Sequence, residues 1–285
     1  MKIGVITDCF KKPLAESVQL AGQLGFAGVQ IYATTGEFSP ETLTAERKQE
    51  IKELLAKNGL EISALCGDMG GHGYEIEADN AERIEKTKAI IDLAAEFGTS
   101  VITTHIGVIP ADKTEPRYGV MLRALNACGS YAKSKNITLA IETGPETADT
   151  LYAFLQDTEG GVGVNLDPAN FVMVTGQDPV AAVELLGKYI VHTHIKDGVM
   201  LKKTDPKTIY DCFAEGGIEA LNVADYFLET PLGEGHVDFP KYIAALKKVG
   251  FDGYLTIERE TGADPVADII TARDMVRGIL QPAQN

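Results

Sequence analysis

The sequence of 285 residues lacks the features that mark several special classes of protein. It has only four cysteines, with no CxxC motif and no close pair, which favours a reduced setting over a disulfide framework. No segment approaches the roughly 18 consecutive apolar residues that a membrane helix requires. The first residues, MKIGVITDCF, lack the pattern of a secretion signal and suggest a strand instead. We therefore expect a cytoplasmic protein without a membrane partner.

Basic residues are scarce relative to acidic ones. The chain has 26 Lys and Arg against 41 Asp and Glu, for a formal net charge of −15. A surface this acidic repels phosphate backbones, so we expect no nucleic-acid partner. Low-complexity tracts and linker-like stretches are absent too. We therefore expect residues 1–285 to form a single domain, long enough to bury a full-size core.

Short apolar segments alternate with longer amphipathic ones along the chain. The short segments predict eight strands, at residues 2–7, 28–32, 60–66, 100–105, 137–142, 162–167, 190–195 and 254–258. Helical spacing predicts helices between them, for instance at 81–97, before Gly98, and after Asp178, where Pro179 suits the first helical position. Strands rich in Val and Ile are typical of a parallel sheet covered by helices. Eight such units predict a (β/α)8 TIM barrel.

One connection is much longer than the others. Residues 196–236 lie between the seventh strand and a helix predicted at 239–248, and loops this long are usually functional or carry small helices. The segment has too many apolar residues for a solvated loop. We expect it to cap the barrel mouth or to pack against a second subunit, which would make a homo-oligomer. These apolar residues are Ile209, Tyr210, Phe213, Leu221, Tyr226 and Phe227.

Polar residues stand at the ends of successive predicted strands. The active site of a TIM barrel lies where the strands end, and Glu142, Asp167, His194 and Glu258 occupy that position in strands five to eight. Each acid alone is equally compatible with a helix N-cap or a solvated loop residue. Together, however, three carboxylates would repel one another unless a cation lay between them. The mixed oxygen and nitrogen set predicts a site for Mn²⁺, Mg²⁺, Co²⁺ or Zn²⁺.

Three further histidines, His192, His105 and His72, each allow more than one role. His192 shares a strand face with His194 and lies one layer deeper, which favours a core position. His105, at the end of strand four, is either a contact of the substrate or the metal shell, or a plain rim residue. His72 lies in a glycine-rich loop, residues 66–73, where backbone is able to approach a ligand closely. A flexible turn is the alternative for His72.

Two charged residues near the long connection are further candidates for substrate contact. Lys196 follows strand seven, and it would either supply positive charge to an enediolate or phosphate, or pair with Asp197. Glu234 lies in the segment GEGH just before the predicted helix at 239–248. That segment is either one that closes over a substrate or an ordinary loop.

Five motifs, taken in order, resemble one protein family. They are IET at 141–143, NLDPANF at 165–171, VHTHIKDG at 191–198, PLGEGHVDF at 231–239 and LTIERE at 255–260. The chain resembles the sugar phosphate isomerase/epimerase family of the xylose isomerase-like TIM barrel superfamily over nearly its whole length. The resemblance implies one divalent metal ion, with Mn²⁺ favoured, held by Glu142, Asp167, His194 and Glu258. It also implies that Glu142 and Glu258 move protons.

The chain departs from the family pattern at one position. Many members have Asp-x-x-His where this chain has Asp167-Pro168-Ala169-Asn170, so Asn170 stands where a histidine contacts substrate or a second metal. His105 corresponds to the strand-four histidine that endonuclease IV uses for an extra metal. Asn170 and the net charge nevertheless argue against a multi-zinc nuclease.

The resemblance predicts a reaction class with alternatives. The leading expectation is a metal-dependent isomerase or epimerase acting on a sugar, keto-polyol or sugar phosphate, by proton transfer through an enediolate. Loss of a β-hydroxyl instead would make the protein a dehydratase of an inosose-like keto sugar. A nuclease resembling endonuclease IV and a non-catalytic sugar-binding barrel are the remaining alternatives.

Overall fold

The computed structural model describes residues 1–215 and 222–281. Within these ranges, parallel strands close into a barrel whose hydrogen-bonded order is β1-β10-β7-β6-β5-β4-β3-β2. Strand β1 pairs directly with β10, the last barrel strand along the chain, and Lys2 lies opposite Tyr254. This closure confirms the predicted (β/α)8 barrel. The barrel strands are β1 (Lys2–Ile6), β2 (Gly28–Tyr32), β3 (Glu61–Cys66), β4 (Val101–Thr104), β5 (Thr138–Glu142), β6 (Val162–Leu166), β7 (Ile190–Ile195) and β10 (Tyr254–Ile257).

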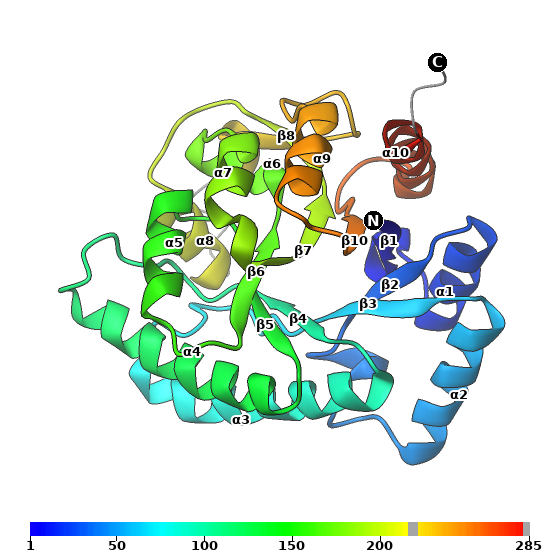
Figure 1. Cartoon of the computed structure of the whole chain (residues 1–285), viewed down its shortest axis with the longest axis horizontal. Coiled ribbons are helices and arrows are strands. Elements are labelled where there is room, and N and C mark those ends of the chain that lie inside the picture. The colour runs from blue at the N-terminus through cyan, green and yellow to red at the C-terminus, as the bar shows by residue number, and fades with distance from the viewer. Residues whose placement is uncertain (216–221, 282–285) are drawn as a thin grey trace.

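Helices surround this barrel (Figure 1). Their N-termini follow local capping rules: the Thr44 side chain accepts a hydrogen bond from Arg47 N, and Asp178 caps a helix that begins at Pro179. None of the helices in the described ranges is both long and apolar enough to span a bilayer. The outer helices are α1 (Leu14–Gln23), α2 (Ala45–Lys57), α3 (Glu77–Phe97), α4 (Pro116–Ser134), α5 (Ala148–Asp157), α7 (Pro179–Leu186), α9 (Phe239–Lys248) and α10 (Pro265–Leu280).

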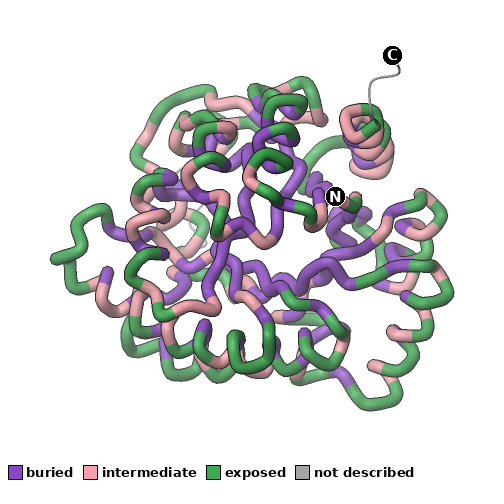
Figure 2. The backbone as a smooth tube through the Cα atoms, in the orientation of Figure 1, coloured by how far each residue is buried: buried purple, intermediate pink, exposed green. Residues whose placement is uncertain are grey.

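Side chains alternate between two environments along the barrel strands. On β5, Leu139 and Ile141 belong to the large apolar cluster, whereas Ala140 belongs to a smaller cluster with Ala64 on β3. Strand residues two apart share a face, so Glu142 lies on the same face as Ala140. Figure 2 shows the buried residues concentrated along the central strands.

The segment after β7 forms small elements of its own. Strand β8 (Asp197–Met200) pairs in antiparallel fashion with β9 (Phe227–Thr230), and α8 (Pro206–Glu215) lies between them in sequence. Ile209 of α8 packs in a separate buried cluster with Met173 and Val174, from the turn of π-helix η3 (Phe171–Thr175). Leu221, one of the apolar residues predicted to cap the barrel, lies outside the described residues.

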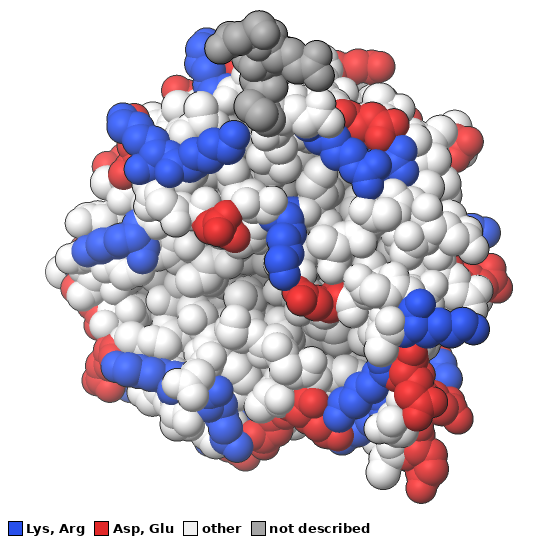
Figure 3. All heavy atoms as spheres, turned by 45° about the vertical axis from the view of Figure 1, so that its right-hand side comes forward, with Lys and Arg blue, Asp and Glu red and all other residues white. Residues whose placement is uncertain are grey.

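Short helical turns complete the structure. They are α6 (Pro168–Asn170), η1 (Thr7–Phe10), η2 (Gly36–Phe38), η4 (Gly187–Tyr189) and η5 (Val223–Asp225). The turns α6 and η3 directly follow β6, a region for which the sequence predicted no helix. On the face drawn in Figure 3, acidic and basic side chains are intermingled without a broad basic area.

Candidate metal centre and active site

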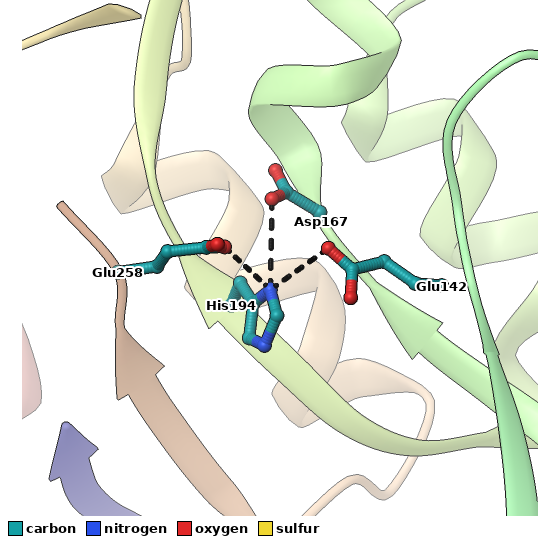
Figure 4. A group of neighbouring side chains, drawn as sticks. All are labelled: Glu142, Asp167, His194 and Glu258. Carbon is teal, nitrogen blue, oxygen red and sulfur yellow. Dashed lines mark ion pairs between the residues drawn. The ribbon is translucent and has the colours of Figure 1, made fainter. Parts of the chain in front are cut away.

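Four side chains predicted as metal ligands converge at the ends of β5, β6, β7 and β10. His194 Nδ1 lies 2.7 Å from Glu258 Oε2, 3.3 Å from Glu142 Oε1 and 3.6 Å from Asp167 Oδ2. One potential ligand atom from each residue lies within 4.8 Å of all the others, and all four residues are buried. In Figure 4, the carboxylates of Glu142 and Glu258 approach His194 from opposite sides, with Asp167 between them.

Asp167 is a helix N-cap, one of the roles that the sequence left open, and its second carboxylate oxygen stays free. Its Oδ1 accepts hydrogen bonds from Ala169 N (2.8 Å) and Asn170 N (3.2 Å), and so caps α6. Its Oδ2 is buried and has no hydrogen-bond partner. The cap fixes the orientation of the carboxylate, and the free oxygen points toward His194.

The amide side chains of Gln30 and Asn165 contact the His194 ring at Nε2. His194 Nε2 lies 3.1 Å from Gln30 Oε1 and 3.2 Å from Asn165 Nδ2. When Nδ1 binds a metal, Nε2 carries the ring proton, and Gln30 Oε1 is then its acceptor. Asn165 Nδ2 also donates to Glu142 Oε2, at 3.2 Å. Gln30 therefore orients His194, and Asn165 orients Glu142, from outside the cluster.

The unpartnered atoms of the cluster fit a divalent cation. Asp167 Oδ2, His194 Nδ1 and Glu258 Oε2 are all buried without a hydrogen-bond partner, although buried polar atoms normally have one. Burial lowers the pKa of His194, but Glu258, Glu142 and Asp167 outweigh burial and raise this pKa well above its ordinary value. That excess of negative potential, with three carboxylate oxygens and one imidazole nitrogen, matches the donor set of a divalent transition metal or Mg²⁺.

Lys196 provides positive charge beside the cluster. Its Nζ lies 3.4 Å from Glu258 Oε1 and 2.5 Å from Glu260 Oε2. Burial raises the pKa of Glu258, yet Lys196 and His194 outweigh burial and hold this pKa below its ordinary value. The sequence also allowed a pair between Lys196 and Asp197, and the structure corrects this. Asp197 instead accepts hydrogen bonds from backbone N–H groups.

The backbone groups that Asp197 binds belong to two segments. Its carboxylate accepts from Gly198 N and, in the following loop, from Gly233 N, Gly235 N and Val237 N, at 2.9–3.1 Å. A Cβ added at Gly235 would collide with this carboxylate, which explains the need for glycine there. The loop is thus tied to the end of β7. Its Glu234 side chain is exposed and does not line the cavity described below, contrary to the predicted substrate contact.

His105 stands at the rim between Asp68 and Glu142. Its Nδ1 lies 3.0 Å from Asp68 Oδ2, and its Nε2 lies 3.9 Å from Glu142 Oε1. Burial lowers the pKa of His105, but the two carboxylates outweigh burial and raise this pKa to about 10. His105 is therefore a cation near neutral pH and faces the cluster.

A cavity of about 580 Å³ opens onto the cluster. Among the predicted contact residues, His72, His105, Asn170 and Lys196 line it. Asn170 is buried, and its Nδ2 donates to Thr143 O at 2.9 Å. One wall is apolar and comes from η3 and the segment after β7; it includes Met173, Val174, Tyr210, Phe213 and Phe227.

Tyr210, which the sequence predicted only as part of the capping segment, lines the cavity, and Glu146, which the sequence did not single out, lies near it. The Tyr210 ring lies 6.0 Å from the His105 ring, and its hydroxyl group is so close to Gly144 that an added Cβ would collide with it. Glu146 is buried, and neither carboxylate oxygen has a hydrogen-bond partner. Burial raises the pKa of Glu146 to about 8.

Only some of these missed residues leave a signal in the sequence. Gln30 interrupts the apolar strand GVQIY, and Asn165 interrupts VGVNL, so each is a polar residue in a buried strand. His192 is buried between Asn165 and Thr256, at 2.9 and 3.0 Å, as predicted for a core histidine. Asp68 and Glu146 lie in loops, where an acidic residue is unremarkable.

The chain is similar to proteins of known family. The model of the family described as xylose isomerase-like TIM barrel matches residues 18–279. The chain is 39% identical over 288 residues to L-ribulose-5-phosphate 3-epimerase UlaE of Escherichia coli (strain SMS-3-5 / SECEC), a match covering 94% of this chain and 90% of the relative. It is 23% identical over 171 residues to inosose dehydratase of Clostridium tetani, covering 58% of this chain and 55% of the relative. The crystal structure of a xylose isomerase domain protein from Planctomyces limnophilus matches with a TM-score of 0.78 and 25% identity, covering 98% and 96% of the two chains.

Proposed function

Because the chain belongs to the xylose isomerase-like TIM barrel family, we propose that it is a metal-dependent isomerase or epimerase of a sugar, keto-polyol or sugar phosphate. The observation that carries this proposal is the convergence of Glu142, Asp167, His194 and Glu258, with ligand atoms within 4.8 Å of one another. The epimerase relative supports the same reaction class. We further propose one domain over residues 1–285, since a single apolar cluster extends from Val5 to Val276.

The proposed metal site consists of these four residues, with Mn²⁺ as the preferred ion. A bound divalent ion would stabilise the negative charge that develops on a substrate carbonyl oxygen when the neighbouring carbon loses its proton. Asp167 and His194 hold the ion in this proposal. The Asp167 cap on α6 and the Gln30 contact to His194 fix both side chains without the need for substrate.

Glu142 and Glu258 are the proposed proton carriers. They approach the cluster from opposite sides (Figure 4), as two groups must when one removes a proton from a carbon and the other returns it. Lys196 and His194 lower the pKa of Glu258 and so weaken it as a base, but a carboxylate that binds a metal through one oxygen keeps the other free to take a proton. Return of the proton to the opposite face of the same carbon gives an epimer, and return to the adjacent carbon gives an isomer.

His105, Lys196, Asn170 and His72 are the proposed substrate contacts, because all four line the cavity beside the cluster. His105 and Lys196 are cations that face carboxylates of the cluster, so each is able to stabilise an enediolate oxygen. Asn170 and His72 offer further hydrogen-bonding groups.

A screen in D₂O tests the proposal. Protein stripped by a chelator and reloaded with Mn²⁺, Co²⁺, Mg²⁺ or Zn²⁺ is mixed with ketoses, keto-polyols and sugar phosphates, and products are followed by NMR and mass spectrometry. We expect deuterium at a carbon next to a carbonyl and otherwise unchanged composition. Loss of water would identify the dehydratase alternative, which the inosose dehydratase relative favours. Absence of both, with metal bound, would reject an enzyme of either kind.

A further inference from the structure

Acidic residues dominate the charged lining of the active-site cavity. Seven of its described lining residues are Asp or Glu, whereas Lys196 is the only Lys or Arg among them. The undescribed residues 216–221 have the sequence GGIEAL, which adds no basic side chain. The charged lining is therefore mainly negative, and it is poorly suited to binding an anionic ligand such as a phosphate group.

Most cations near the cavity are paired with its carboxylates; Arg83, beside Gly71 and Asp68, makes no ion pair within the described residues. Lys196 contacts Glu258 and Glu260. Two more cations engage carboxylates of the lining at 2.6–2.8 Å; these pairs are Arg117 with Glu75 and Arg259 with Glu229. The His105 ring lies 3.0 Å from Asp68. Phosphate recognition normally relies on a free Arg or Lys or on an open helix N-terminus. The short helix nearest the cluster, α6, is already capped by Asp167.

An adjoining cavity of about 440 Å³ is the nearest alternative place for an anion. Lys11 and Lys12 line it, and Lys12 lies 4.0 Å from Glu16. However, Glu258 and Glu260 line this cavity too, together with Asp8 and Glu37. A phosphate there would still face more carboxylates than cations.

Resting on the proposed function, we propose that the substrate of this site is an uncharged polyhydroxy ketone or aldehyde and not a sugar phosphate. Carboxylates, imidazoles and the Gln30 amide offer hydrogen bonds to hydroxyl groups without any need for a charged ligand. The apolar wall that includes Met173, Tyr210 and Phe227 suits the carbon-bound hydrogens of the same molecule. This differs from the epimerase relative, whose name specifies a 5-phosphate.

Paired substrates test the proposal on Mn²⁺-loaded protein. Fructose is compared with fructose 6-phosphate, and ribulose with ribulose 5-phosphate, both for turnover and for binding by calorimetry. We expect the free sugars to have kcat/KM and affinity higher by roughly 100-fold, because a phosphate in this cavity would face more carboxylates than cations. Equal or tighter binding of the phosphates would overturn the proposal. If that preference then disappeared on substitution of Lys11 and Lys12 by Ala, the phosphate would belong to the adjoining cavity.

A charge variant tests the cause of the discrimination. Glu260→Gln removes one carboxylate from the lining and one of the two carboxylate partners of Lys196. The ratio of kcat/KM for the free sugar to kcat/KM for its phosphate should therefore fall by about tenfold. Glu184→Gln is the matched control, since it removes one exposed carboxylate paired with Lys248 on the outer helices. An unchanged ratio in Glu260→Gln would overturn the electrostatic explanation.

Binding and turnover separate this proposal from the proposed function. If free sugars bind and their phosphates do not, but neither is converted, the substrate class stands and the isomerase function fails. If the phosphates are converted in preference, the function stands and the substrate class fails. If neither class binds, the substrate class is rejected as well.

Discussion

At the scale of single residues, Asp167 is both a proposed metal ligand and a helix cap, and the two contributions are measurable separately. Asp167→Ala removes a proposed oxygen ligand and should lower metal affinity by at least roughly 10²-fold. This is more than the usual loss when a residue that hydrogen-bonds to a ligand is removed. It also removes a helix cap worth about 1 kcal/mol. Asp178→Ala is the matched control, because Asp178 caps α7 on the outside of the barrel. Calorimetric titration with Mn²⁺ should show weaker binding only in Asp167→Ala, and wild-type affinity there would exclude Asp167 as a ligand.

The two glutamates are expected to contribute basicity as well as ligand oxygens. Glu142→Gln and Glu258→Gln retain size and one oxygen but lose the ability to take a proton. Each should lower turnover by at least ~10², the low end for a positioned acid–base group. Metal should still bind, although more weakly. Near wild-type rates in both metal-saturated variants would exclude the two-base mechanism, whereas D₂O exchange without product in one variant would identify the face that it serves.

Glu146 should make stability depend on pH. Its pKa is raised to about 8 in the folded protein, above the ordinary 4.5, so the folded state holds a proton that the unfolded state has lost. The stabilising effect of that proton is complete below about pH 4.5 and is lost as pH rises to about 8, with a slope of up to about 1.4 kcal/mol per pH unit. Glu146→Gln should remove this contribution.

Denaturant unfolding at several pH values between about 5 and 9 measures this contribution. The free energy of unfolding of Glu146→Gln relative to wild type should increase with pH over this range. Glu159→Gln, on the exposed connection after α5, changes the same charge and should not produce the trend. A constant difference between Glu146→Gln and wild type would contradict the raised pKa.

At the scale of elements, Asp197 connects β7 to the loop at 231–237. Asp197→Ala leaves the buried N–H groups of Gly198 and Val237 without acceptors, at roughly 1–3 kcal/mol for each. It also removes the acceptor of the less buried N–H groups of Gly233 and Gly235. We expect a lower melting temperature and faster hydrogen exchange at Gly233, Gly235 and Val237. Asp205→Ala, which removes an exposed carboxylate bound to Lys207 N, is the control. Unchanged exchange in the loop would show that Asp197 does not hold it.

At the scale of the whole molecule, metal should act as a stabilising ligand. An ion that binds only the folded state at 100 times its Kd adds about 2.7 kcal/mol to the free energy of unfolding. For a chain of this length this corresponds to a rise in Tm of roughly 4–5 °C. A thermal scan with and without Mn²⁺ should show the rise in wild type and little of it in Asp167→Ala. An equal rise in both proteins would indicate binding elsewhere.

Local sequence patterns were sufficient to predict the barrel and where its strands end. Asp167 directly follows β6 and His194 lies near the end of β7, and the rule that barrel sites occupy strand ends was enough to single out both. Contacts between distant strands were not predictable in the same way. The Gln30 side chain contacts His194 across the barrel interior, and Lys196 forms an ion pair with Glu260 instead of with its neighbour Asp197. Such choices depend on which strands become neighbours and on where each loop turns, which no local pattern specifies.

The pairing of β1 with β10 has a consequence for the order in which the molecule is made. Glu258 directly follows β10, the last strand, whereas the other proposed ligands lie much earlier in the chain. A chain emerging from the ribosome exposes its N-terminal part first. Glu142, Asp167 and His194 therefore emerge before the strand that closes the barrel. A nascent chain that ends before residue 254 offers an incomplete set of the proposed ligands, so the proposed metal centre assembles only after β10 has been synthesised.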